Sequence, residues 1–161
     1  MVSKRLRIFA AFFAGNIFFF FLSSLVLWLL TRYEISPYGR FVATFFKGRK
    51  PEEAQAAIEA NRALFDALLP QAVRFSDLFV MPAVGFLMGC IVGAIMRGRQ
   101  WYAGPVWALI IAGPVSIFFL VRSEGAERFP YLAVFLALIA LGGFAGNAFA
   151  NRAASGTAKT E

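Results

Sequence analysis

Histidine is absent from the 161 residues, and cysteine occurs only once, at position 90. Without histidine the chain lacks the commonest general base, the commonest metal ligand and the usual pH switch near neutrality. A single cysteine excludes an intramolecular disulfide and a cysteine-rich metal site. The motifs HExxH, GxSxG, CxxC and the P-loop are missing as well. We therefore expect no enzymatic activity, no cofactor and no metal centre.

Charge is also scarce, since 16% of the residues are charged and 60% are hydrophobic. The 20 phenylalanines cluster with Leu, Ile, Val and Ala in stretches that are apolar on every face of a helix, which indicates a lipid solvent. The net charge of +7 comes from basic residues at the edges of these stretches. Such residues are typical of membrane-surface anchors, and we expect the partner to be the lipid bilayer and not nucleic acid.

Four apolar stretches are close to the length that a membrane span requires. About 20 residues at about 1.5 Å rise per residue cross a hydrocarbon core of about 30 Å. The sequence therefore predicts a single all-α membrane domain, residues 1–161, built as a four-transmembrane-helix bundle with a flexible tail at 151–161. Kinks are expected at Pro82 and Pro114, where the helix loses a backbone donor. The predicted spans are 8–31, 78–96, 102–121 and 129–150.

The polar stretch 32–77, between the first two spans, contains two helix signals. Ser36 and Pro37 suit the N-cap and first position of a short amphipathic helix that carries Phe41 and Phe45, and we expect this helix to lie in the membrane interface. Pro51 begins a second helix, followed by two glutamates that complement the helix dipole.

The second helix of this stretch is expected to stop before Pro70. Ile58, Phe65 and Leu69 recur on it at spacings of seven and four, which places them on one face. A stripe of this kind needs a partner surface. We therefore predict it as a contact site for another protein.

The basic residues also predict an orientation. With the N-terminus in the cytoplasm, the inner segments hold seven basic residues and one acid, and the outer segments hold nine basic residues and eight acids. A bare count of basic residues favours the opposite orientation, but their density in short segments favours this one. We predict a multi-pass protein of bacterial inner-membrane type with both termini cytoplasmic and 32–77 extracytoplasmic.

Glycine spacing gives the clearest motif. Gly85, Gly89 and Gly93 form a GxxxGxxxG face on the second span, and Gly142 and Gly146 have the same spacing on the fourth. Small residues at this spacing let two helix backbones approach closely in lipid. The two faces either pack on each other or contact a second copy or a different membrane subunit.

Asn16 and Asn147 are polar residues inside apolar spans, where an unpaired amide is costly. Each is expected to face protein, and a direct bond between them is one candidate for an intramembrane contact. A substrate-binding pair is the alternative. Both lie in a shared Phe-Ala-Gly-Asn-x-Phe pattern at 13–18 and 144–149, which is either a remnant of an inverted repeat or a coincidence.

Two functions remain open from the sequence. The first is a non-enzymatic accessory or scaffold subunit of a membrane complex that acts through helix–helix contacts. The second is a small transporter or channel formed by oligomerisation. The spans carry no deep ionisable side chain, which favours the first.

Overall fold

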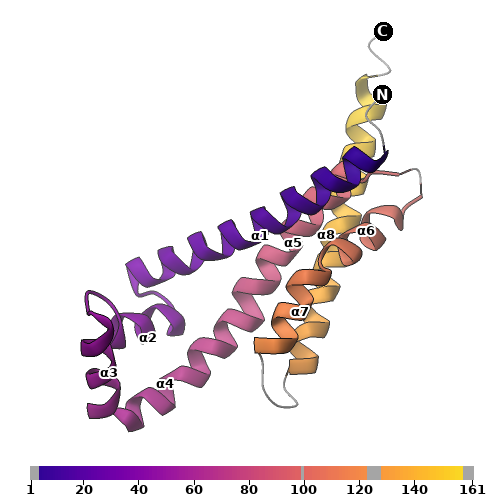
Figure 1. Cartoon of the computed structure of the whole chain (residues 1–161). Coiled ribbons are helices and arrows are strands. Elements are labelled where there is room, and N and C mark those ends of the chain that lie inside the picture. Colours follow the sequence, from indigo (N-terminus) through magenta and orange to yellow (C-terminus); the bar gives the residue numbers. More distant parts are fainter. Residues whose placement is uncertain (1–3, 99, 123–127, 158–161) are drawn as a thin grey trace. The chain divides into compact units, whose positions relative to one another are not determined.

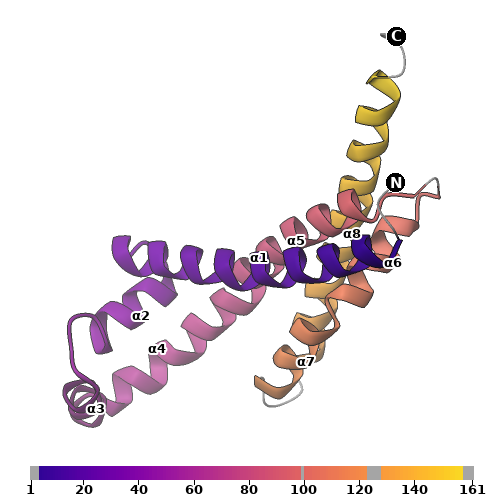
Figure 2. The ribbon, with the colours of Figure 1, turned by 45° about the horizontal axis from the view of Figure 1, so that its top comes forward.

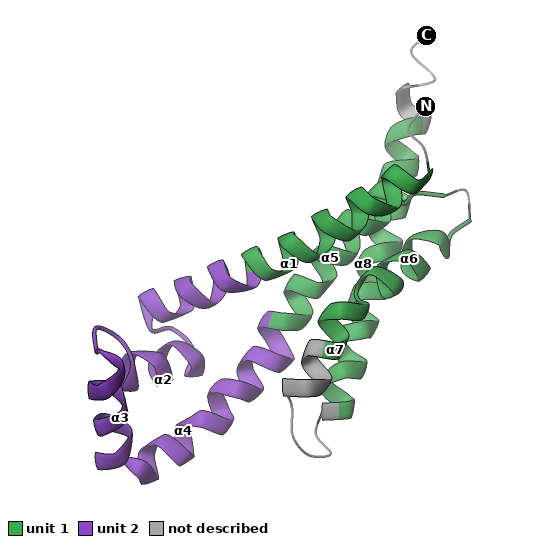
Figure 3. Ribbon diagram, in the orientation of Figure 1, with its two compact units in different colours: residues 1–22, 81–161 green, residues 23–80 purple. Residues whose placement is uncertain are grey.

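The computed structural model describes residues 4–98, 100–122 and 128–157, and the elements in these ranges are all helical (Figure 1). The chain divides into two compact units (Figure 3). Unit 1 comprises residues 1–22 and 81–161, and unit 2 comprises residues 23–80. The helices are α1 Lys4–Tyr33, α2 Pro37–Phe45, α3 Pro51–Ala60, α4 Arg62–Phe75, the π-helix η1 Ser76–Val80, α5 Met81–Ile95, α6 Ala103–Ile111, α7 Gly113–Arg122 and α8 Arg128–Thr157.

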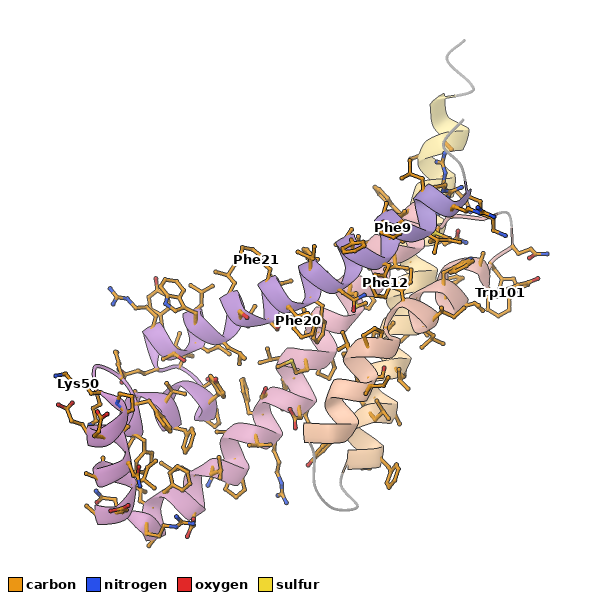
Figure 4. All side chains as sticks on the ribbon, viewed as in Figure 1. Phe9, Phe12, Phe20, Phe21, Lys50 and Trp101 are labelled. Atoms are coloured by element: carbon orange, nitrogen blue, oxygen red, sulfur yellow. The ribbon has the colours of Figure 1, made fainter. Side chains whose placement is uncertain are left out.

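Three helices of the described residues are long and apolar enough to cross a membrane. They are Lys4–Tyr33, the continuous helix Arg62–Ile95 and Phe129–Ala154. Phe9 and Phe21 of α1 are 63% and 66% exposed (Figure 4), as expected of side chains that face lipid. The predicted all-α, multi-pass membrane character is confirmed at this level.

The predicted third span is not one long helix. It consists of α6 and α7, which are separated at Ala112. Pro114 explains the break, because it has no N–H to donate to the carbonyl of Ile110 and its ring crowds the preceding turn. The kink predicted at this proline is therefore confirmed, and it divides the span into helices of 9 and 10 residues.

Pro82 also lies next to an irregular turn, in the long helix Arg62–Ile95. The π-helix Ser76–Val80 ends two residues before it. A π-turn accommodates one extra residue per turn and is a recognised cause of helix bending. The second predicted kink thus corresponds to a local change of helix type.

The prediction that the helix beginning at Pro51 ends before Pro70 is wrong in two respects. The helix breaks earlier, at Asn61, whose φ and ψ of −130° and 40° are not helical. A new helix then runs through Pro70. Packing of the next turn, where Ala72 is 2% exposed, holds the helix together across the missing hydrogen bond.

In unit 1, α5 and α8 run parallel and in close contact. Gly142 of α8 lies against the backbone of Phe86. Gly146, which is four residues later, lies against the backbone of Cys90, which is four residues after Phe86. The first part of α1 runs antiparallel to α5, since Arg7 bonds to Ile95 near the end of α5. Figures 1 and 2 show the start of α1, the α5–α6 loop and the end of α8 at one end of this unit.

In unit 2, α2 and α4 pack around an aromatic core. Ser36 accepts a hydrogen bond from the N–H of Gly39 at 3.0 Å, so it caps α2 as predicted. Phe41 and Phe45 are buried against Phe65, with ring centroids 5.4 and 5.3 Å away. The apolar face of α2 is therefore covered by the same unit.

Candidate functional site

The two glycine faces predicted from the sequence contact each other in unit 1. A Cβ on Gly89 would overlap the carbonyl oxygen of Ile139, and one on Gly93 would overlap the carbonyl oxygen of Gly143. At Gly85 the nearest atom would be a ring carbon of Phe135, at 2.7 Å. α8 thus occupies the glycine face of α5. This contact is the first of the two alternatives that the sequence leaves open, packing of the two faces on each other.

The α8 face is used in the same way. A Cβ on Gly142 would overlap the carbonyl oxygen of Phe86, and one on Gly146 would overlap that of Cys90. Because these obstructing atoms are backbone, only glycine permits this separation of the two helices. The faces are a structural element of unit 1.

Asn147 organises the loop between α5 and α6. It is 2% exposed, its Oδ1 accepts from the N–H of Gly98 at 2.9 Å, and its Nδ2 donates to the carbonyl of Gln100 at 3.3 Å. One turn further on, Nδ2 of Asn151 donates to the carbonyl of Gly98 at 2.9 Å. Both sides of the buried amide are satisfied, so its role here is to hold the loop on α8.

Two arginines bind carbonyls at the same end of unit 1. Nε of Arg7 donates to the carbonyl of Ile95 at 3.1 Å, and Nη1 of Arg97 donates to the carbonyl of Ala150 at 3.3 Å. The last carbonyls of a helix lack intrahelical donors and carry the negative end of its dipole, so a guanidinium is favourable there. Arg7 therefore suits the end of α5, whereas Arg97 binds a carbonyl inside α8, which continues to Thr157.

Asn16 has a different partner from Asn147. Its Nδ2 donates to Ile111 at 3.2 Å and to Phe12, within its own helix, at 2.9 Å. Ile111 is the last residue of α6, so the amide binds a carbonyl at the break before α7. The two asparagines thus bind separate stretches of backbone.

The stripe on α3 and α4 is placed within unit 2. Ile58, Phe65 and Leu69 are partly buried against the core of Phe41 and Phe45. The surface that this stripe requires is therefore α2 of the same chain. These three side chains therefore do not form an open contact face for another protein.

A buried pair was missed by the sequence analysis. Ser76 and Asp77, in the π-helix, are 0% and 4% exposed. The sequence placed Asp77 at the rim of a span, because the apolar run begins only after it. The sequence signals only a kink at Pro82; the π-turn beside it, a feature that is frequent at functional sites, is seen in the structure alone.

Unit 2 also has an open groove of about 490 Å³ on its surface. It is lined by the residue that follows α1 and by residues of α2 and α4: Glu34, Arg40, Ala43, Thr44, Leu64 and Leu68. Glu34 is held at one side by Nζ of Lys47, at 2.6 Å. Arg40 and Leu64 are exposed, so the groove offers one cation beside an apolar surface.

Comparisons with known proteins gave no assignment: no family model, curated protein or solved structure matches this chain. No group of three or more His, Cys, Asp or Glu side chains with metal-binding geometry occurs among the described residues. Glu124 and Glu127 lie in sequence between Arg122 and Arg128, a pattern that indicates solvated charge more than an acid/base pair. Both glutamates lie outside the described residues.

Proposed function

We propose that this chain is a non-enzymatic accessory or scaffold subunit of the bacterial inner membrane whose unit 2 binds a partner protein. The observation that carries the proposal is the groove beside Arg40 and Leu64. Unit 2 packs α2 and α4 around its own core. A folded unit presents such a groove without the entropic cost of ordering a loop on binding.

The groove defines the chemistry of the partner. Arg40 provides five donors in a planar fork that suits a carboxylate. Leu64 is 46% exposed beside it, and Leu68 is partly buried. The complementary segment therefore carries an acidic side chain next to an apolar one, on a part of the partner that emerges from the membrane.

A charge reversal tests this assignment. The wild type, Arg40→Glu and Lys50→Glu are purified in mild detergent, and the co-purifying protein is quantified. Lys50, labelled in Figure 4, is the matched control, because it is exposed in the same unit and is not among the residues that line the groove. We expect the partner protein to co-purify with the wild type and with Lys50→Glu, and to be lost with Arg40→Glu. A wild type that elutes alone as a monomer, or retention by Arg40→Glu, contradicts the proposal.

For the topology we propose four crossings with both termini cytoplasmic and 32–77 outside. Two observations in unit 1 support it. The α5 and α8 helices run parallel, so the chain must return between them. The α6–α7 pair spans residues 103–122, about 30 Å at helical rise. Topology reporters fused at each terminus and inserted at Gly48 test this. We expect cytoplasmic signals from the termini and an external signal from Gly48, and a terminus outside contradicts it.

A small transporter or channel is the second candidate, and the buried Asp77 favours it. An ionisable side chain within a membrane helix is costly and commonly marks an ion or proton path. The test is flux by the purified protein in liposomes, comparing Asp77→Asn with Asp66→Asn. Asp66 is the control, since it is exposed and pairs with Arg62 at 3.2 Å. Flux that Asp77→Asn alone abolishes would select this candidate over the scaffold.

A further inference from the structure

A second groove lies in unit 1, between α5 and α8. Its volume is about 720 Å³, within the range of small-molecule sites. The lining is apolar except at one end, where Arg152 closes it. The α5 side contributes Phe86, Cys90, Ile91 and Ala94, and the α8 side contributes Phe144, Ala145, Gly146, Ala148, Phe149 and Arg152.

The length of this groove matches one leaflet of a bilayer. It extends from Phe86 to Ala94 on α5 and from Phe144 to Arg152 on α8. Eight residues at helical rise give about 12 Å on each helix, close to half of a hydrocarbon core of about 30 Å. A transmembrane helix of another subunit would pack along the full thickness, so the groove is too short for that occupant.

The charged end of the groove suits a phosphate. Arg152 is exposed and is the charged residue among those that line the groove. Arginine binds phosphate with paired N–H donors. Basic pockets between membrane helices at the cytoplasmic side are typical of sites for anionic lipid headgroups.

We propose that the α5–α8 groove binds an anionic phospholipid, with its phosphate at Arg152 and an acyl chain along Phe86, Phe144 and Phe149. Phe149 is 75% exposed and Phe144 47% exposed, so the aromatic walls offer uncovered apolar area to the chain. The small side chains of Ala94, Ala145 and Ala148 leave room between these walls.

Cys90 provides a reporter of occupancy, because it lines the groove and is the only cysteine. The full-length protein is delipidated in a neutral detergent, and the rate of Cys90 alkylation by a maleimide is measured against added dioleoyl phosphatidylglycerol or dioleoyl phosphatidylcholine. We expect phosphatidylglycerol to slow alkylation at lower concentrations than phosphatidylcholine. Native mass spectrometry should show phosphatidylglycerol retained on the monomer.

Three variants distinguish the effect of the charge on Arg152 from a general effect on the fold. Arg152→Gln should raise the half-protecting phosphatidylglycerol concentration about fivefold, and Arg152→Lys should restore part of the loss. Arg62→Gln, on an exposed turn of unit 2, should change nothing. Inorganic phosphate alone should not protect Cys90, because the acyl chain covers the thiol.

The opposite outcomes overturn the proposal. Equal protection by phosphatidylcholine, or an unchanged response of Arg152→Gln, would remove the headgroup site. Protection by inorganic phosphate would indicate a free-anion site. Protection without lipid that accompanies a dimer mass would assign the groove to a second copy of the chain. None of these results depends on the partner site of unit 2.

Discussion

Replacement of Gly89 by alanine tests the contact between α5 and α8 most directly. The added Cβ would overlap the carbonyl oxygen of Ile139, and the amide nitrogen of Gly143 would be 3.0 Å away. Both obstacles are backbone atoms of α8, so no rotamer change relieves them. Overpacking of this kind costs about 1–3 kcal/mol, and the better helix propensity of alanine returns about 0.5–1 kcal/mol.

We therefore expect Gly89→Ala to lower the free energy of unfolding by about 1–2 kcal/mol. The measurement is SDS-induced unfolding in mixed micelles, followed by circular dichroism. Gly85→Ala should cost less, because a Phe135 ring atom can move away. Ala83→Leu is the control, since Ala83 is exposed on the same helix, and it should stay within about 0.5 kcal/mol of wild type. A Gly89→Ala protein as stable as Ala83→Leu would refute the close α5–α8 contact.

Three further substitutions test other contacts. Phe45→Ala removes a side chain that is 1% exposed and should destabilise unit 2 by about 3–5 kcal/mol, seen as faster proteolysis. Asn147→Leu leaves the N–H of Gly98 without its acceptor, and hydrogen exchange at Gly98 should accelerate by at least about tenfold for a loss of about 1.4 kcal/mol or more. Ser36→Ala removes the cap of α2 and should cost about 1 kcal/mol, measured by amide exchange at Gly39.

Local signals were sufficient where a few neighbouring residues determine the structure. Ser36 and Pro37 fix the start of α2 through one hydrogen bond and one restricted φ, and the structure has that start. Pro51 and the glutamates after it likewise begin α3, where the carboxylate of Glu53 accepts from the N–H of Lys50 at 3.1 Å. These features depend on spacings of three residues or fewer.

Tertiary packing decided the features that the sequence analysis missed. Pro70 normally ends a helix, but the buried Ala72 and the partly buried Leu69 hold the helix on both sides of it. The stripe on α3 and α4 was identified as apolar, whereas its partner, α2, depends on how the chain folds back. An apolar pattern predicts that a face is buried but not what buries it.

The residues of the candidate site also divide into those that a local sequence pattern predicts and those that only tertiary packing determines. The spacing of Gly85, Gly89 and Gly93 predicts a packing face, and the sequence left its partner open. Asn147 has no local signal for its bonds to Gly98 and Gln100, which are 49 and 47 residues away along the chain. The burial of Asp77 also depends on tertiary neighbours, so residue type and position alone place it at the rim of a span.

The α6–α7 pair shows why helix length alone does not determine how often this chain crosses the bilayer. A criterion based on long helices selects three spans and omits this pair. Gly104 near the start of α6 nevertheless lies against Gly143 and Asn147 in the second half of α8, whereas α8 begins at the other end of unit 1 (Figure 1). The chain must cover that distance between α5 and α8. The α6–α7 pair covers it, and at the break between the two helices Nδ2 of Asn16 donates to the carbonyl of Ile111 at 3.2 Å. Lipid offers a backbone carbonyl no other donor, so this bond supports the fourth crossing that we propose.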